Sequence, residues 1–168
     1  PAITGALLHN LLTHVYGDLL GLITPETQYY TPLSENKIYP MDKFGEAVAV
    51  ADVWHSSGLK IGIFPGSLDG PHILHAFECR NLYERVDRVI VAVDPGWLVK
   101  KLKDKPDDPR PRIDSTVWKM WNMALPTVDL VMETPITKID SPEDLDRQWG
   151  EIYSALHIKA IACAEDNP

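Results

Sequence analysis

Short apolar runs alternate with helical patterns along the last two-thirds of this chain. Four of these runs have the length and composition of buried strands. They cover residues 59–64, 88–93, 128–132 and 158–162. Between them, apolar positions recur with the spacing of a helix face, over residues 74–85, 115–125 and 141–156. Strands that alternate with helices form parallel sheets with right-handed crossovers. The pattern therefore predicts the α/β class, with a doubly wound, Rossmann-like parallel sheet.

The beginning of the chain breaks this alternation. Thr4 can cap a leucine-rich amphipathic helix that runs to about Leu22. Prolines then interrupt any period, and residues 37–39 are one candidate for a short strand before a second helical stretch. We expect residues 1–58 to form an N-terminal helical extension, packed on the core or on a partner subunit. Residues 59–168 then form the α/β domain, one strand short of a full doubly wound sheet, as in a domain truncated at its C-terminus.

Composition narrows the choice of partners. Of the 168 residues, 45% are hydrophobic and 24% charged, which is typical of globular proteins. The net charge of −8 disfavours general binding to nucleic acid, which needs clustered Lys and Arg. Cys79 and Cys163 form no disulfide framework, and no secretion signal is visible, so we expect a cytoplasmic location. Polar residues interrupt the leucine-rich stretch 6–23, which indicates an amphipathic helix and no membrane partner.

The loop after the first of the four strands holds the main candidates for chemistry. It reads Phe64-Pro65-Gly66-Ser67-Leu68-Asp69-Gly70-Pro71-His72-Ile73-Leu74-His75. In open parallel sheets, ligands bind beyond the carboxyl ends of the strands, where the strand order reverses. His72 and His75 fall at the start of the next helix, where free N–H groups and positive potential attract phosphate. Imidazoles at that position can donate hydrogen bonds to phosphoryl oxygens as charge develops on them.

This loop resembles the signature of the nucleotidylyltransferase superfamily. That signature is an apolar strand, a Gly-x-Phe-Asp-like loop and then His-x-Gly-His or Thr-x-Gly-His. The Pro-Gly-Ser-x-Asp portion is most similar to the pantetheine-phosphate adenylyltransferases and cytidylyltransferase-like proteins. Asp69 stands three residues before His72 and six before His75, as in that signature. The likeness extends over residues 59–166, about two-thirds of the chain.

The resemblance implies an activity and a set of site residues. A nucleoside monophosphate would pass from a nucleoside triphosphate to a small phosphorylated acceptor, pyrophosphate would leave, and Mg²⁺ would accompany the triphosphate. The implied catalytic residues are His72, His75, Lys101 and Arg112. The implied nucleotide- and substrate-binding residues are Phe64, Pro65, Gly66, Ser67, Asp69, Lys100 and Asp129. Adenylyl transfer is slightly favoured over cytidylyl transfer, and a homo-oligomer is expected.

Two departures from the signature keep other functions open. Leu74 stands where the family has glycine, and no Ile-Ser-(Ser/Thr)-Thr-like motif follows the fourth strand. One alternative is a non-catalytic nucleotide-binding or assembly module of the same fold. Another is a metal hydrolase that uses His72 and His75 as ligands. A tryptophan stripe at Trp118 and Trp121 has helical spacing, and we expect it to pack in the core.

Overall fold

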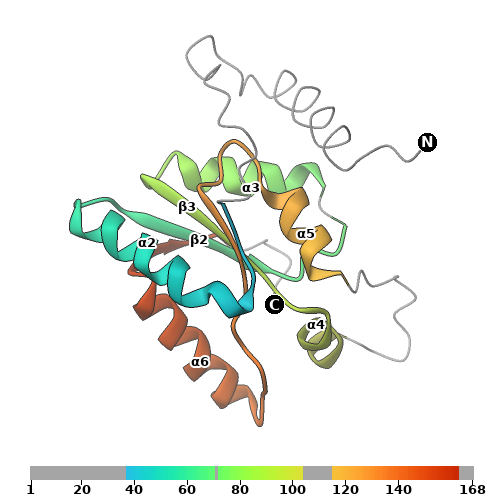
Figure 1. Cartoon of the computed structure of the whole chain (residues 1–168). Coiled ribbons are helices and arrows are strands. Elements are labelled where there is room, and N and C mark those ends of the chain that lie inside the picture. The colour runs from blue at the N-terminus through green and yellow to red at the C-terminus, as the bar shows by residue number, and fades with distance from the viewer. Residues whose placement is uncertain (1–36, 71, 104–114, 163–168) are drawn as a thin grey trace.

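The computed structural model describes residues 37–70, 72–103 and 115–162 (Figure 1). Five parallel strands form one sheet in the order β1-β4-β3-β2-β5, which confirms the expected doubly wound α/β class. The strands are β1 (Ile38–Tyr39), β2 (Ile61–Gly66), β3 (Arg88–Val93), β4 (Leu130–Glu133) and β5 (Ile158–Ile161). The helices are η2 (Met41–Lys43), α2 (Phe44–Ser56), α3 (Ile73–Tyr83), α4 (Gly96–Lys103), α5 (Thr116–Met123) and α6 (Pro142–Ala155).

Two helical layers cover the sheet (Figure 1). Side chains alternate along β3, so that Val89, Val91 and Val93 face one layer while Ile90 and Ala92 face the other. The valine face packs against residues of α3 and α5, and the other face packs against residues of α2 and α6. All five of these β3 residues are fully buried, as expected for a central parallel strand.

Part of the expected extension belongs to the sheet itself. In β1, Ile38 pairs with Val131 of β4, and α2 contributes the fully buried Ala47 and Ala51 to the core. Residues 37–58 therefore share one sheet and one core with the rest of the fold. The leucine-rich helix expected near the N-terminus lies outside the described residues.

Helix α4 corrects an expectation from the sequence. Residues 100–112 are rich in charged residues and prolines, a pattern that predicts a loop, but residues through Lys103 are helical. Burial explains the difference, because Leu98 and Val99 are nearly inaccessible and fix this segment against the sheet. The helix starts directly after Pro95, whose carbonyl accepts from the backbone N–H groups of Leu98 and Val99.

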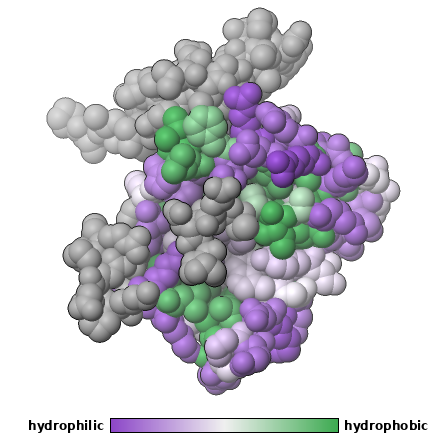
Figure 2. All heavy atoms as spheres, turned by 180° about the vertical axis from the view of Figure 1, so that it is seen from behind, coloured by the Kyte–Doolittle hydropathy of each residue, from purple (hydrophilic) through white to green (hydrophobic). Residues whose placement is uncertain are grey.

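The tryptophan stripe of α5 also differs from the expectation. Trp118 is 43% exposed and Trp121 is 37% exposed, while Lys119, Met120 and Met123 face the interior. The prediction that these tryptophans pack in the core was therefore wrong. Figure 2 shows hydrophobic surface in separate patches among hydrophilic side chains on the face opposite to that of Figure 1. Within the described ranges, no helix is long and apolar enough to cross a membrane.

A close contact fixes α3 against β2. A Cβ atom added to Gly62 would lie 2.7 Å from Cδ1 of Leu82, so only glycine lets the helix approach this closely. The chain passes from β2 to β3 and β4, and then returns to the other side of β2 as β5. The strand order thus reverses at β2, whose carboxyl end leads into α3.

Candidate functional site

The histidine loop, residues 66–75, follows β2 and enters α3. His72 is the N-cap of α3, with extended backbone at φ −137° and ψ 177°. A helix start of this kind presents N–H groups that no carbonyl inside the helix accepts. The loop therefore places both histidines at the carboxyl edge of the sheet and at the positive end of a helix.

The two imidazoles lie together. Their ring centroids are 3.9 Å apart, and the backbone N–H of His72 donates to Nδ1 of His75 at 3.0 Å. Since Nδ1 accepts, a neutral His75 carries its hydrogen on Nε2. The pKa of His75 is lowered from 6.5 to about 4, mainly by burial and in addition by the charges of His72 and Lys103. Near neutral pH this ring is an uncharged donor.

Leu74 points mainly away from the interior. In the family signature a glycine stands at this position, and a leucine here predicts crowding of the ligand space. Its side chain is 62% exposed and thus projects mainly into solvent. On the other side of His75 lies the buried ring of Phe64, with centroids 6.0 Å apart.

The backbone of the histidine loop is held in an uncommon conformation. Leu68 has φ +48° and Gly70 has φ +71°, both in the left-handed region. Glycine adopts this region readily, whereas a leucine does so at an energetic cost. The Leu68 side chain is almost fully buried in the core beneath α3, and this burial holds the strained turn. Strained backbone that surrounding structure maintains is often found at functional sites.

Lys103 is the cation that the structure brings to this loop. Its Nζ donates to Oγ of Ser67 at 3.1 Å, and its charge acts on His75. By contrast, Nζ of Lys101 donates to the carbonyl of Ile139 in the segment after β4. Lys100 lies exposed on the same helix. The family resemblance implied Lys100 and Lys101 as site residues. In the structure it is Lys103 that contacts the histidine loop.

Buried charges lie behind the loop. Lys119 is completely buried, and its Nζ lies 2.7 Å from Oδ1 of Asp69. Asp94, directly after β3, accepts at 2.9 Å from the hydroxyl of Thr134, directly after β4. Burial raises the pKa of Asp94, while the Thr134 hydrogen bond and the charges of Lys103 and Lys119 oppose the rise.

Sequence reasoning missed three members of this group. Asp94 and Thr134 each follow the last residue of a strand, and that position alone marks the carboxyl edge where parallel sheets bind ligands. Lys119 carries no such signal, since a lysine between tryptophans on a short helix is typical of a surface. Only the packing of α5 against the sheet reveals it.

Of the other expected site residues, one is not brought to the loop and one cannot be placed. Asp129 lies at the amino end of β4, at the opposite edge of the sheet, where Oδ2 accepts from the backbone N–H of Val89 at 2.8 Å. Burial raises its pKa, and that hydrogen bond opposes the rise. Its role there is to satisfy backbone. Arg112 lies outside the described residues.

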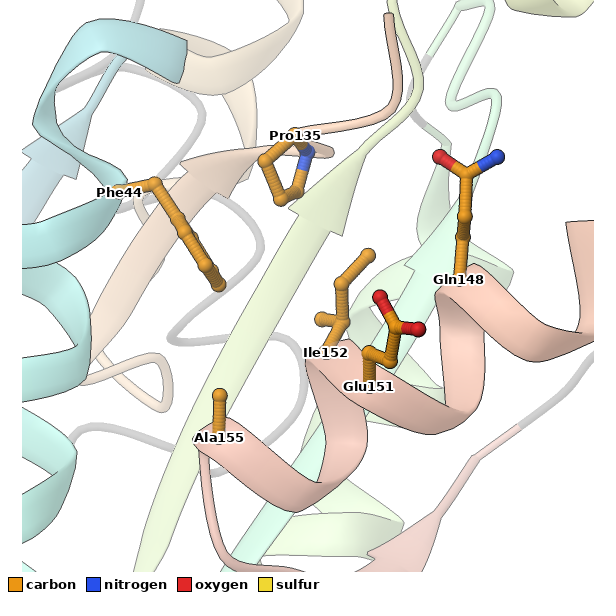
Figure 3. A pocket seen from close by; sticks show the side chains of 6 residues that line it. All are labelled: Phe44, Pro135, Gln148, Glu151, Ile152 and Ala155. Atoms are coloured by element: carbon orange, nitrogen blue, oxygen red, sulfur yellow. The ribbon is translucent and has the colours of Figure 1, made fainter. Parts of the chain in front are cut away.

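A separate groove lies between α2 and α6 (Figure 3). Its volume is about 270 Å³, and Phe44 and Pro135 face Ile152 of α6 across it, with Gln148 and Glu151 at the rim. These helices cover the sheet face that is not covered by α3. No group of three His, Cys, Asp or Glu side chains suited to a metal ion occurs in the part of the chain that the structure describes.

The chain matches no protein-family model, and it matches no curated protein. Arguments about function therefore start from the geometry at the carboxyl edge of β2.

Proposed function

We propose that this chain transfers a nucleoside monophosphate from a nucleoside triphosphate to a small phosphorylated acceptor, with release of pyrophosphate. The observation that carries the proposal is the convergence of His72 and His75, 3.9 Å apart, at the first turn of α3. A second support is Lys103, which reaches Ser67 from α4 beside the same loop. The site thus combines imidazole donors, a cation and helix N–H groups, all of which suit phosphate.

Each residue has a role in the proposed reaction. His75 donates from Nε2, because Nδ1 is occupied by the backbone N–H of His72. His72 and His75 bind oxygens of the α- and β-phosphates and follow the charge that develops there. Lys103 neutralises phosphate charge, and the Ser67 hydroxyl orients either the lysine or a phosphate oxygen.

The chemistry needs no covalent enzyme intermediate. An oxygen of the acceptor phosphate forms a bond to the α-phosphorus, and the bond from that phosphorus to the oxygen bridging to the β-phosphate breaks. The bridging oxygen keeps the electron pair, and pyrophosphate leaves. Such transfers depend mainly on positioning and on stabilisation of charge.

Magnesium enters this proposal as a companion of the triphosphate. When bound, it neutralises charge on the phosphate oxygens, which are its principal ligands in such complexes. Asp94 is the carboxylate at the ends of β3 and β4, but its Oδ1 is engaged by Thr134. We therefore assign no protein ligand to the ion. The homo-oligomer, the choice of ATP over CTP and the cytoplasmic location stay predictions.

The test measures pyrophosphate release with each nucleoside triphosphate, Mg²⁺ and a panel of phosphomonoester acceptors. We expect acceptor-dependent release, and the largest signal with ATP. His72→Ala and His75→Ala should each lower kcat/KM by about 10²–10³-fold, the cost of losing a donor to a transition-state oxygen. Lys138→Met is the matched control, since Lys138 pairs with Asp140 on the surface.

The alternatives give different results. Nucleotide binding without release in any combination would contradict the proposal and support the non-catalytic module of the same fold. A stoichiometric transition metal in the purified protein would instead support the hydrolase. Loss of release in Lys138→Met to the same extent as in His75→Ala would show that the histidines act only through stability.

A further inference from the structure

Lys119 is a charged side chain in a place that normally excludes one. It lies on the inner side of α5, with no exposed surface, while Trp118 and Trp121 of the same helix face outward. Lysine is almost never fully buried unless it is paired, because removing an ammonium group from water is costly. Its burial therefore calls for a specific partner.

That partner belongs to the histidine loop. Nζ of Lys119 lies 2.7 Å from Oδ1 of Asp69, whose side chain is only 10% exposed. The ammonium nitrogen and both carboxylate oxygens are shielded from solvent. In a medium of lower dielectric constant than water, the attraction between opposite charges at this distance is strong, although the two groups do not meet in hydrogen-bond geometry. It joins α5 to the loop after β2.

The position of Asp69 gives the pair control of the loop. Asp69 stands between the two residues with left-handed backbone, Leu68 at φ +48° and Gly70 at φ +71°. Three residues later comes His72, whose N–H fixes the His75 ring. A displacement at Asp69 would thus pass directly to the start of α3.

The pair also sets the charge next to the site. Asp94 feels Lys103 and Lys119, which favour its charged form, and Asp69, which disfavours it. Two carboxylates close to a phosphate site would repel a nucleotide. The buried ammonium of Lys119 offsets that repulsion.

We propose that Lys119 is a positioning residue, whose buried ammonium holds Asp69 and thereby fixes the histidine loop in the shape that brings His72 and His75 together. The inference depends on the proposed function only in taking a nucleotide as the ligand of the loop. The loop geometry can be tested without one. Similarly sized apolar residues often replace buried ion pairs without loss of stability, so stability alone is a poor reason for such a pair.

The experiment compares Lys119→Met, Asp69→Asn and the double variant, with Lys138→Met as the control from an exposed pair. The first readout is the ¹⁵N resonances of His75 in the whole chain without nucleotide. In the native protein they should report one tautomer, with hydrogen on Nε2. In both single variants and in the double variant we expect averaging between tautomers, because the loop no longer holds the His72 N–H against Nδ1.

The double variant separates positioning from simple charge balance. It is neutral at both sites, so it should fold even where Lys119→Met does not. We expect it to bind Mg²⁺-ATP at least about tenfold more weakly than the native chain, a loss of about 1.4 kcal/mol. Native tautomer signals and native affinity in the double variant would overturn the inference. If no form binds nucleotide, the proposed function fails, and the tautomer signals still decide the role of Lys119.

Discussion

The two edges of the sheet use charged side chains in different ways. At the amino edge, charged groups satisfy backbone: Nζ of Lys37 donates to the carbonyl of Val128 at 2.8 Å, and Oδ2 of Asp87 accepts from the N–H of Lys60 at 2.8 Å. At the carboxyl edge, Lys101 and Glu133 also bond to backbone, but the fully buried Lys119 pairs with Asp69, and Thr134 donates to Asp94. The last two contacts join side chains to each other, so they satisfy no backbone group of a strand or helix.

This difference separates structural charges from functional ones. A charge that caps an open strand end is explained by the hydrogen bond it makes. A fully buried charge paired with another side chain brings a desolvation penalty, and a replacement by apolar groups is often neutral. The carboxyl edge keeps such charges beside strained backbone and convergent imidazoles, which is where perturbed ionisable groups are expected to serve function.

The largest expected effect comes from breaking the carboxyl-edge pair on one side. Lys119→Met should lower the free energy of unfolding by about 3–5 kcal/mol, because it leaves the carboxylate of Asp69 buried without its cation. Urea unfolding followed by circular dichroism measures the change. The exposed pair gives the control, with Lys138→Met expected to change stability by less than about 1 kcal/mol. An equal loss of stability in Lys119→Met and Lys138→Met would contradict the special role of the buried pair at the carboxyl edge.

An intermediate effect is expected at the amino edge. Asp129→Ala leaves the N–H of Val89 without its acceptor and should cost about 1–3 kcal/mol of stability. The His72 and His75 resonances should stay as in the native chain, since Asp129 lies at the other end of the strands. Urea unfolding measures the loss of stability, and the imidazole spectrum shows whether the histidine resonances change. A shift of the His75 signals would mean that Asp129 does act on the histidine loop.

A third effect appears only at acid pH and comes from the titration of His75. Its pKa is lowered from 6.5 to about 4 in the folded chain. Between these values the unfolded chain binds a proton that the folded chain does not, so stability should fall as the pH drops from 6.5 towards 4. Titration of the imidazole proton shifts should give a midpoint near 4 for His75, and His75→Gln should flatten the stability profile across this window. A midpoint near 6.5 would contradict the burial of this ring, which is the main cause of its lowered pKa.

Sequence reasoning succeeded where a local pattern carried the answer. The strand at residues 88–93 has the bounds that its unbroken apolar run predicts, and α3 starts within one residue of the expected position. The two histidines could be placed at a helix start because Gly70 and the proline at position 71 precede them in the sequence. Their closeness in space follows from helical geometry, since side chains three residues apart share a face.

Other parts of the site depend on contacts that no local pattern encodes. In α5 two apolar faces compete, one with Trp118 and Trp121 and one with Met120 and Met123, and only packing against the sheet decides between them. The buried face carries Lys119 inward with it. No local pattern distinguishes Lys101 from Lys103. In the structure, however, Lys101 contacts Ile139 and Lys103 contacts Ser67.

The bond from the His72 N–H to Nδ1 of His75 limits what this ring can do to water. One nitrogen has its lone pair engaged by backbone, and the other keeps its hydrogen, so the neutral ring offers no base towards a bound nucleotide. In the proposed reaction, His75 would therefore not remove a proton from a water molecule that entered beside the triphosphate. An ionised phosphate acceptor needs no such help, so this single backbone contact would favour productive transfer over wasteful hydrolysis.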